Sequence, residues 1–107
     1  MKENENIEFK QEYTENIYKE IVAFLNSYSG TIFIGYDDNG NLIGLNNVKE
    51  IEEKISNGIT QKIMPDCSLF VSIENCSLDN KDYIVVKVNK GLNIYNLKEK
   101  GVLKGIR

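Results

Sequence analysis

The chain has 107 residues, of which 41% are hydrophobic, and this is enough for one domain with one modest core. No stretch approaches the roughly 20 apolar residues of a membrane helix, and the polar start lacks the apolar run of a signal peptide. We therefore expect a cytoplasmic protein with no membrane partner. The sequence contains no histidine, which excludes any mechanism that needs an imidazole base or ligand from this chain.

Charge is distributed unevenly along the chain. The net charge is -3, but residues 1–80 carry 6 basic and 14 acidic side chains, whereas residues 81–107 carry 7 basic and 2 acidic ones. The acidic total argues against a protein that wraps duplex DNA by charge alone, because phosphate neutralisation needs clustered Lys and Arg. The basic end is either a phosphate-facing patch or a solubilising terminus, as many small proteins have.

The first quarter of the chain predicts a strand and a helix. Residues 5–10 alternate apolar and polar side chains, as a strand with one buried face does. Apolar residues then recur at helical spacing from a cap at Thr14 to Tyr28. Ser29 and Gly30 end this helix.

A hairpin and a second helix follow. Residues 31–36 and 42–45 are rich in apolar side chains and predict two antiparallel strands. The turn between them contains Asn39-Gly40, a pair that tolerates positive φ. Asn47 and Glu50 then resemble a capping box, and the helical apolar spacing that begins there ends before Pro65.

The rest of the chain predicts another hairpin, from strands at 68–78 and 83–88. Residues 91–107 are basic and lack a strong period, so we expect a less regular C-terminal segment. Together the elements predict an α+β fold, in which a mixed or antiparallel sheet packs with two helices in the order β-α-β-β-α-β-β. We expect residues 1–107 to be a single domain that is truncated from a longer protein.

One group of acidic residues is placed for metal chemistry. Glu3 and Glu8 lie on or near the first strand, and Asp37 and Asp38 stand at the tip of the hairpin. If the two strands are neighbours, three carboxylates converge at one end of the sheet, where they would hold Mg²⁺ or Mn²⁺ for phosphodiester cleavage. Turn chemistry explains the two aspartates as well, so the residues alone leave both interpretations open.

Other ligand sites have less support. An EF-hand loop starting at Asp37 would need glycine and glutamate at its sixth and twelfth positions, which are Leu42 and Val48. The sequence has neither a phosphate loop nor a dinucleotide-binding glycine fingerprint, so we expect no ATP. Tyrosines can stack on nucleic-acid bases, and we expect Tyr36 and Tyr95 to lie in open segments.

An ordered series of motifs runs through the first half of the chain. Its members are Glu8-Phe9-Lys10, the helical stretch AFLNS at 23–27, Gly30, and IGYDDNGNLIG at 34–44. The series resembles the Schlafen AlbA_2 domain, also called the divergent AAA-4 domain, and the resemblance covers nearly the whole chain. The sequence departs from the family pattern at Ser29, where glycine is usual, and at Ile94, where proline is common.

The resemblance implies the front domain of a bacterial transcriptional regulator, whose C-terminal winged-helix modules would be further partners. We therefore expect a DNA-binding or RNA-binding module that needs no cofactor for binding. The side chains that we expect to contact the nucleic acid are Lys10, Lys87, Lys90, Lys98, Lys100, Lys104 and Arg107.

Two alternatives stay open beside this preferred function. In the Schlafen branch of the family, three carboxylates support metal-dependent RNA cleavage, and the residues that match them are Glu3, Glu8 and Asp38. Mg²⁺ or Mn²⁺ would be a cofactor only under this alternative, and we consider an enzyme the less expected outcome. The other alternative is a scaffold without catalysis, which would assemble as a homo-oligomer.

Overall fold

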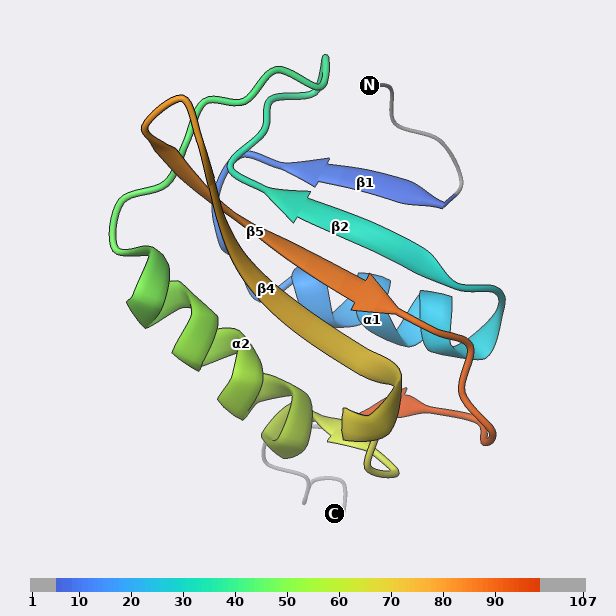
Figure 1. Cartoon of the computed structure of the whole chain (residues 1–107). Helices are drawn as coiled ribbons and strands as arrows, with labels where there is room; N and C mark the ends of the chain where they lie inside the picture. The colour runs from blue at the N-terminus through green and yellow to red at the C-terminus, as the bar shows by residue number, and fades with distance from the viewer. Residues whose placement is uncertain (1–5, 99–107) are drawn as a thin grey trace.

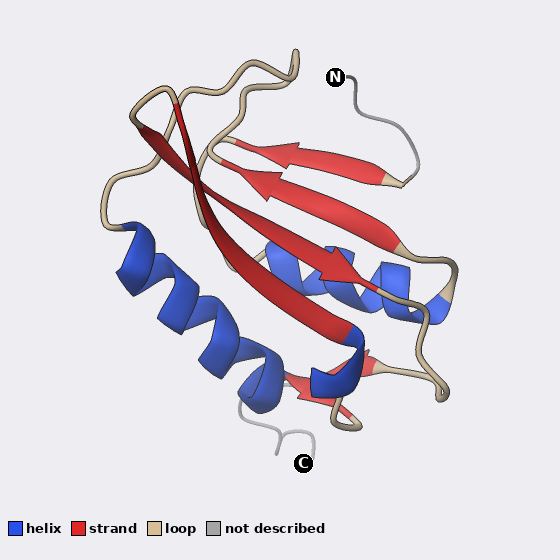
Figure 2. Ribbon diagram, viewed as in Figure 1, coloured by secondary structure: helices blue, strands red, loops and turns tan. Residues whose placement is uncertain are grey.

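The computed structural model describes residues 6–98, which form a four-stranded sheet, a two-stranded sheet and two α-helices (Figure 1). The α+β fold predicted from the sequence is confirmed, and the order of the elements broadly follows the prediction (Figure 2). In chain order the elements are β1 (Ile7–Lys10), α1 (Ile17–Asn26), β2 (Gly30–Ile34), α2 (Val48–Lys62), β3 (Ile63–Met64), the 3-10 turn η1 (Ser68–Phe70), β4 (Val71–Leu78), β5 (Lys81–Val88) and β6 (Asn96–Leu97).

The larger sheet is mixed and has the strand order β1-β2-β5-β4. β1 runs parallel to β2, and α1 supplies the crossover that a parallel connection needs. β5 pairs with β2 and with β4 in the antiparallel sense. The small sheet joins β3 to β6 and so holds the C-terminal part of the described chain against the end of α2.

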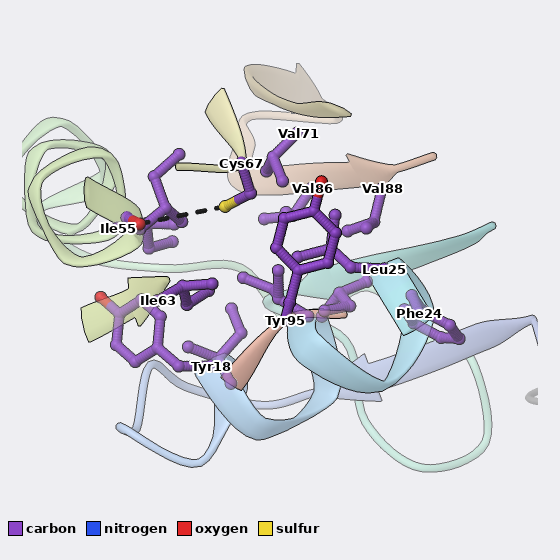
Figure 3. Packing of buried hydrophobic residues seen from close by; sticks show 14 of the residues in the cluster. Tyr18, Phe24, Leu25, Ile55, Ile63, Cys67, Val71, Val86, Val88 and Tyr95 are labelled. Carbon is purple, nitrogen blue, oxygen red and sulfur yellow. Dashed lines mark hydrogen bonds between the residues drawn. The ribbon is translucent and has the colours of Figure 1, made fainter. Parts of the chain in front are cut away.

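Both helices pack on one face of the larger sheet. Alternate residues of β2 and β5, such as Ile32 and Val86, point to this face and are fully buried. They meet Leu25 of α1 and Ile55 of α2 in one hydrophobic core. Figure 3 shows this core, with Tyr95 reaching into it from the loop before β6. In residues 6–98, neither helix has the length and apolar character to span a membrane.

The predicted strand at 42–45 forms only one antiparallel bridge, between Tyr36 and Leu42. Gly35 explains the difference, because its φ of 108° turns the chain out of β2. The Gly35 carbonyl then accepts hydrogen bonds from the amides of Ile43 and Gly44, which folds the loop back on itself. β5, rather than the 42–45 segment, occupies the place beside β2.

The predicted capping box at the start of α2 is wrong. Asn47 has a left-handed backbone, with φ of 56°, and its side chain makes no capping hydrogen bond. The helix that was predicted to reach Tyr28 also ends earlier, at Asn26, where the Ser27 hydroxyl donates to the Ala23 carbonyl. The second hairpin is confirmed: Asp79 and Asn80 both have positive φ, as a tight turn between β4 and β5 requires.

Candidate functional site

The candidate acidic residues lie towards one end of the larger sheet. Because β1 and β2 are parallel and in register, both strands end at the same edge, where Lys10 is paired with Ile34. The Lys10 carbonyl accepts hydrogen bonds from the amides of Gly35 and Tyr36, at 2.7 and 3.1 Å. The loop that carries Asp37 and Asp38 therefore starts directly beside the end of β1.

Glu8 lies on the helix side of β1. It pairs with Ile32, whose side chain is buried against the helices, and side chains of paired residues share a face. Lys10 shares this face and reaches α1, where its ammonium lies 2.6 Å from Oε2 of Glu20. This ion pair is only about one quarter exposed, at 26% for Lys10 and 25% for Glu20.

Glu20 is a residue that the sequence did not single out. Its Oε1 atom is buried and has no hydrogen-bond partner in the described part of the chain. Burying a carboxylate oxygen without a hydrogen bond lowers the stability of the fold, and most buried polar atoms in proteins do have a partner. The available signal was weak: Glu20 directly precedes the buried Ile21, but nothing in the sequence links a helix residue to one strand position.

Asp37 and Asp38 have different roles in the loop. The Asp37 carboxylate accepts hydrogen bonds from the Asn39 amide and the Asn41 amide, both at 2.9 Å, and from the Asn41 side chain at 3.2 Å. These bonds, led by that from the Asn41 backbone, lower the pKa of Asp37. The turn therefore accounts for Asp37, while the neighbouring Asp38 is exposed to solvent.

The three-carboxylate site remains a prediction. Glu3 lies outside the described residues, and within residues 6–98 no three acidic or cysteine side chains are close enough to hold a metal ion. Glu8 and Asp38 supply oxygen donors of the type that Mg²⁺ and Mn²⁺ prefer. One is half-buried on the helix side and the other is exposed beyond the end of β2.

The predicted nucleic-acid contacts lie in separate places. Lys87 is on the face of β5 that the helices do not cover, 3.4 Å from Glu74 of β4. Lys90 is exposed after β5, and its amide donates to the Ser29 hydroxyl. Lys98 is exposed on the helix side, where its amide donates to the carbonyl of Lys62. The other three, Lys100, Lys104 and Arg107, lie outside the described residues.

The expectation that Tyr36 and Tyr95 lie in open segments is wrong, because they are only 8% and 1% exposed. Tyr36 packs against the rings of Phe33 and Tyr83 on the face of the sheet without helices, with ring centroids 5.4 and 5.3 Å away. The Tyr95 hydroxyl accepts a hydrogen bond from the Leu92 amide. Both loops fold back over their tyrosines, so these rings are not available as platforms for bases.

Several residues of the motif series have structural roles that account for their identity. A side chain at Gly30 would overlap the Phe24 ring, and Gly40 has a φ of 84° in the turn after Asp37.

Comparison with known protein families gives a match to the family described as Schlafen, AlbA_2. The match covers residues 3–104, which is nearly the whole length of the chain. No curated protein matched the chain.

Proposed function

Because the chain belongs to the Schlafen AlbA_2 family, we propose that it is the nucleic-acid-binding module of a bacterial transcriptional regulator. The observation that carries this proposal is that the three predicted contacts of the basic end that the structure describes, Lys87, Lys90 and Lys98, are all exposed. Phosphate contacts are made by Lys and Arg side chains that can approach the backbone of the nucleic acid. Lys100, Lys104 and Arg107 lie outside the described residues and stay predicted contacts.

The internal contacts of these lysines are weak enough to be replaced by phosphate. The ion pair between Lys87 and Glu74 is open to solvent on both sides, and such pairs contribute about 0–1 kcal/mol to stability. The ammonium of Lys98 is 3.5 Å from the Thr60 carbonyl, at the limit of a hydrogen bond. Lys10 differs, since its close pair with Glu20 joins β1 to α1. Lys10 would therefore contribute less to binding than Lys87 or Lys98.

Electrophoretic mobility shifts with single-stranded and double-stranded DNA and RNA test the proposal. We expect a shift at low salt that weakens for every sequence when Lys87 and Lys98 are both changed to Gln. Lys49 and Lys81, two exposed lysines outside the predicted contacts, provide the matched control, and the double variant Lys49→Gln with Lys81→Gln should shift the probes like the unmodified chain. If the variant without Lys87 and Lys98 also behaves like the unmodified chain, the basic end is not the contact surface.

A metal-dependent ribonuclease is a second candidate. The observation in its favour is that β1 and β2 end at the same edge of the sheet, and the loop that carries Asp38 starts beside the end of β1. Glu3, Glu8 and Asp38 would hold the ion, which would polarise a phosphoryl oxygen and activate water. Asp37 is not included, because its carboxylate is engaged by the turn.

Cleavage of a structured RNA in the presence of Mn²⁺ tests this candidate. Asp38→Ala should abolish cleavage without changing the circular dichroism spectrum, whereas Glu53→Ala, at an exposed position of α2, should cleave normally. Unchanged cleavage by Asp38→Ala would show that Asp38 is not a ligand.

A scaffold that forms homo-oligomers is a third candidate. The observation in its favour is a set of three large aliphatic side chains, Leu69, Leu92 and Ile94, which are 92%, 84% and 79% exposed. They lie on η1 and on the loop before β6, two segments joined by the contact between the Phe70 and Tyr95 rings. Light scattering over a range of concentrations should then give a mass above that of the monomer, and changing the three residues to Ser should restore the monomer mass.

A further inference from the structure

A groove of about 510 Å³ lies between the start of α1 and the end of α2, beside β6. Its walls include Lys19 of α1, Lys62 of α2 and Lys98. A second hollow of about 320 Å³ shares the wall at Tyr18 and Lys62 and adds Lys54, so that the concave surface continues along α2. We call the two hollows together the helix groove.

The helix groove is strongly basic in an acidic chain. Among the described residues 6–98, four lysines line it, at positions 19, 54, 62 and 98, and the one acidic residue is Glu15. The walls therefore carry a net charge of +3, whereas the whole chain carries -3. Glu15 is mostly exposed and lies 3.5 Å from Lys62, so this surface pair adds little to stability and offsets one positive charge of the groove.

The two groove lysines of α2 each lie over a tyrosine ring. The ammonium of Lys54 lies 5.7 Å from the centroid of the Tyr13 ring, and that of Lys62 lies 5.9 Å from the centroid of the Tyr18 ring. The two hydroxyls are 2.9 Å apart, and that of Tyr18 donates to the Lys54 carbonyl. Cations held over aromatic faces are partly ordered before a ligand arrives.

The lysines are spread along the groove rather than gathered at one point. Lys54 and Lys62 are eight residues apart on α2, which corresponds to about 12 Å along the helix axis. Lys98 extends the row past the end of α2, because its amide is hydrogen-bonded to the Lys62 carbonyl. A row of separated cations fits an extended ligand with repeated negative charges better than it fits one small anion.

We propose that the helix groove binds the phosphate backbone of nucleic acid, an inference that rests on the proposed nucleic-acid function. Lys19, Lys54, Lys62 and Lys98 act as point charges towards successive phosphates. The described walls of the groove contain no arginine, the side chain that most often reads base edges. Tyr13 and Tyr18 are engaged by the lysines and by each other, so the groove binds the backbone with little preference for sequence.

Two triple variants with the same change in charge test this inference. One removes groove charges, in Lys19→Gln, Lys62→Gln and Lys98→Gln, and the control removes three lysines that are neither described groove residues nor predicted contacts, in Lys2→Gln, Lys49→Gln and Lys81→Gln. Binding of a labelled single-stranded RNA of mixed sequence is followed by fluorescence anisotropy. The groove triple should lose most of the affinity, and the slope of log K against log salt should flatten by about 2, as expected for three lost contacts to a single strand.

The controls separate the inference from the proposed function. If the groove triple binds like the unmodified chain, or if the control triple loses as much affinity as the groove triple, the groove is not the site and the nucleic-acid function stands. If the unmodified chain does not bind at low salt, the function itself fails. Because Lys62 packs on the ring of Tyr18, the double variant Lys19→Gln with Lys98→Gln repeats the test without changing a core contact.

Inorganic tripolyphosphate distinguishes a backbone site from a site for small polyanions. It should displace the RNA only when its phosphate concentration far exceeds that of the RNA. Displacement at equal phosphate concentration would overturn the inference in favour of a small-anion site.

Discussion

The side-chain amide of Asn26 forms two hydrogen bonds with the backbone of Tyr95. Its nitrogen donates to the Tyr95 carbonyl at 2.9 Å, and its oxygen accepts from the Tyr95 amide at 2.7 Å. These bonds tie the last residue of α1 to the loop that leads into β6. Because Lys98 follows three residues after Tyr95, the same contact positions one cation of the helix groove.

Asn26→Asp should destabilise the fold. The carboxylate cannot donate, so the Tyr95 carbonyl loses its partner and faces a negative charge instead. We expect the free energy of unfolding to fall by about 1–3 kcal/mol, measured by urea denaturation. Asn93→Asp makes the same chemical change at an exposed position of the same loop and should have little effect. Equal losses in the two variants would show that the Asn26 bonds contribute nothing specific.

Gly58→Ala should also destabilise the fold, although alanine favours a helix interior by about 1 kcal/mol over glycine. A Cβ at this position would overlap the hydroxyl of Tyr18, so the ring would have to leave its place in the core. We expect a net loss of about 1–3 kcal/mol, measured by thermal unfolding. Ser56→Ala, at an exposed site of α2, should be neutral or stabilising. Because ring carbons of Tyr18 overlap this Cβ as well, Gly58→Ala should cost less in a Tyr18→Ala background than in the unmodified chain, and an equal cost would exclude this overlap as the cause.

The ion pair between Lys10 and Glu20 should appear as an energetic coupling. Lys10→Met removes the ammonium that lies 2.6 Å from the partly buried Glu20 carboxylate, and Glu20→Met removes that carboxylate. We expect each single variant to lose about 1–3 kcal/mol of unfolding free energy. The double variant should lose less than the sum, because the same contact is then lost only once. Strictly additive losses in urea denaturation would show that the pair is not coupled.

The sequence identified the strands and helices that carry the site, but it did not predict how charges from different segments combine. The strong periods of residues 17–26 and 83–88 dictate α1 and β5, and these are the elements that define the core. The left-handed Asn47 was missed because Asn also suits a standard cap, and side-chain type alone does not distinguish the two backbones.

The helix groove was missed for a different reason. Lys19, Lys54 and Lys62 belong to residues 1–80, a stretch whose total charge is -8. Their alignment with Lys98 depends on the pairing of β3 with β6 and on the contact between Asn26 and Tyr95. Those are tertiary contacts, and no local pattern of charge indicates them.

The Asp37 turn should contribute to stability at neutral pH and lose that contribution in acid. The pKa of Asp37 is lower in the folded chain than the ordinary value of about 3.9, so the contribution is complete above that value and is lost as the pH falls through the folded pKa. The melting temperature of the unmodified chain should therefore exceed that of Asp37→Ala at neutral pH, and the gap should narrow below about pH 4. Asp38→Ala should melt like the unmodified chain at neutral pH. A gap for Asp37→Ala that does not change with pH would contradict this account.

The most direct test of the nucleic-acid function is the affinity of the unmodified chain for labelled RNA and DNA as the salt concentration is raised from about 50 to 200 mM. Fluorescence anisotropy should give a log K that falls linearly with log salt, because lysine contacts to phosphate release bound counterions. Absence of binding at the lowest salt, or an affinity that does not depend on salt, would contradict the central claim.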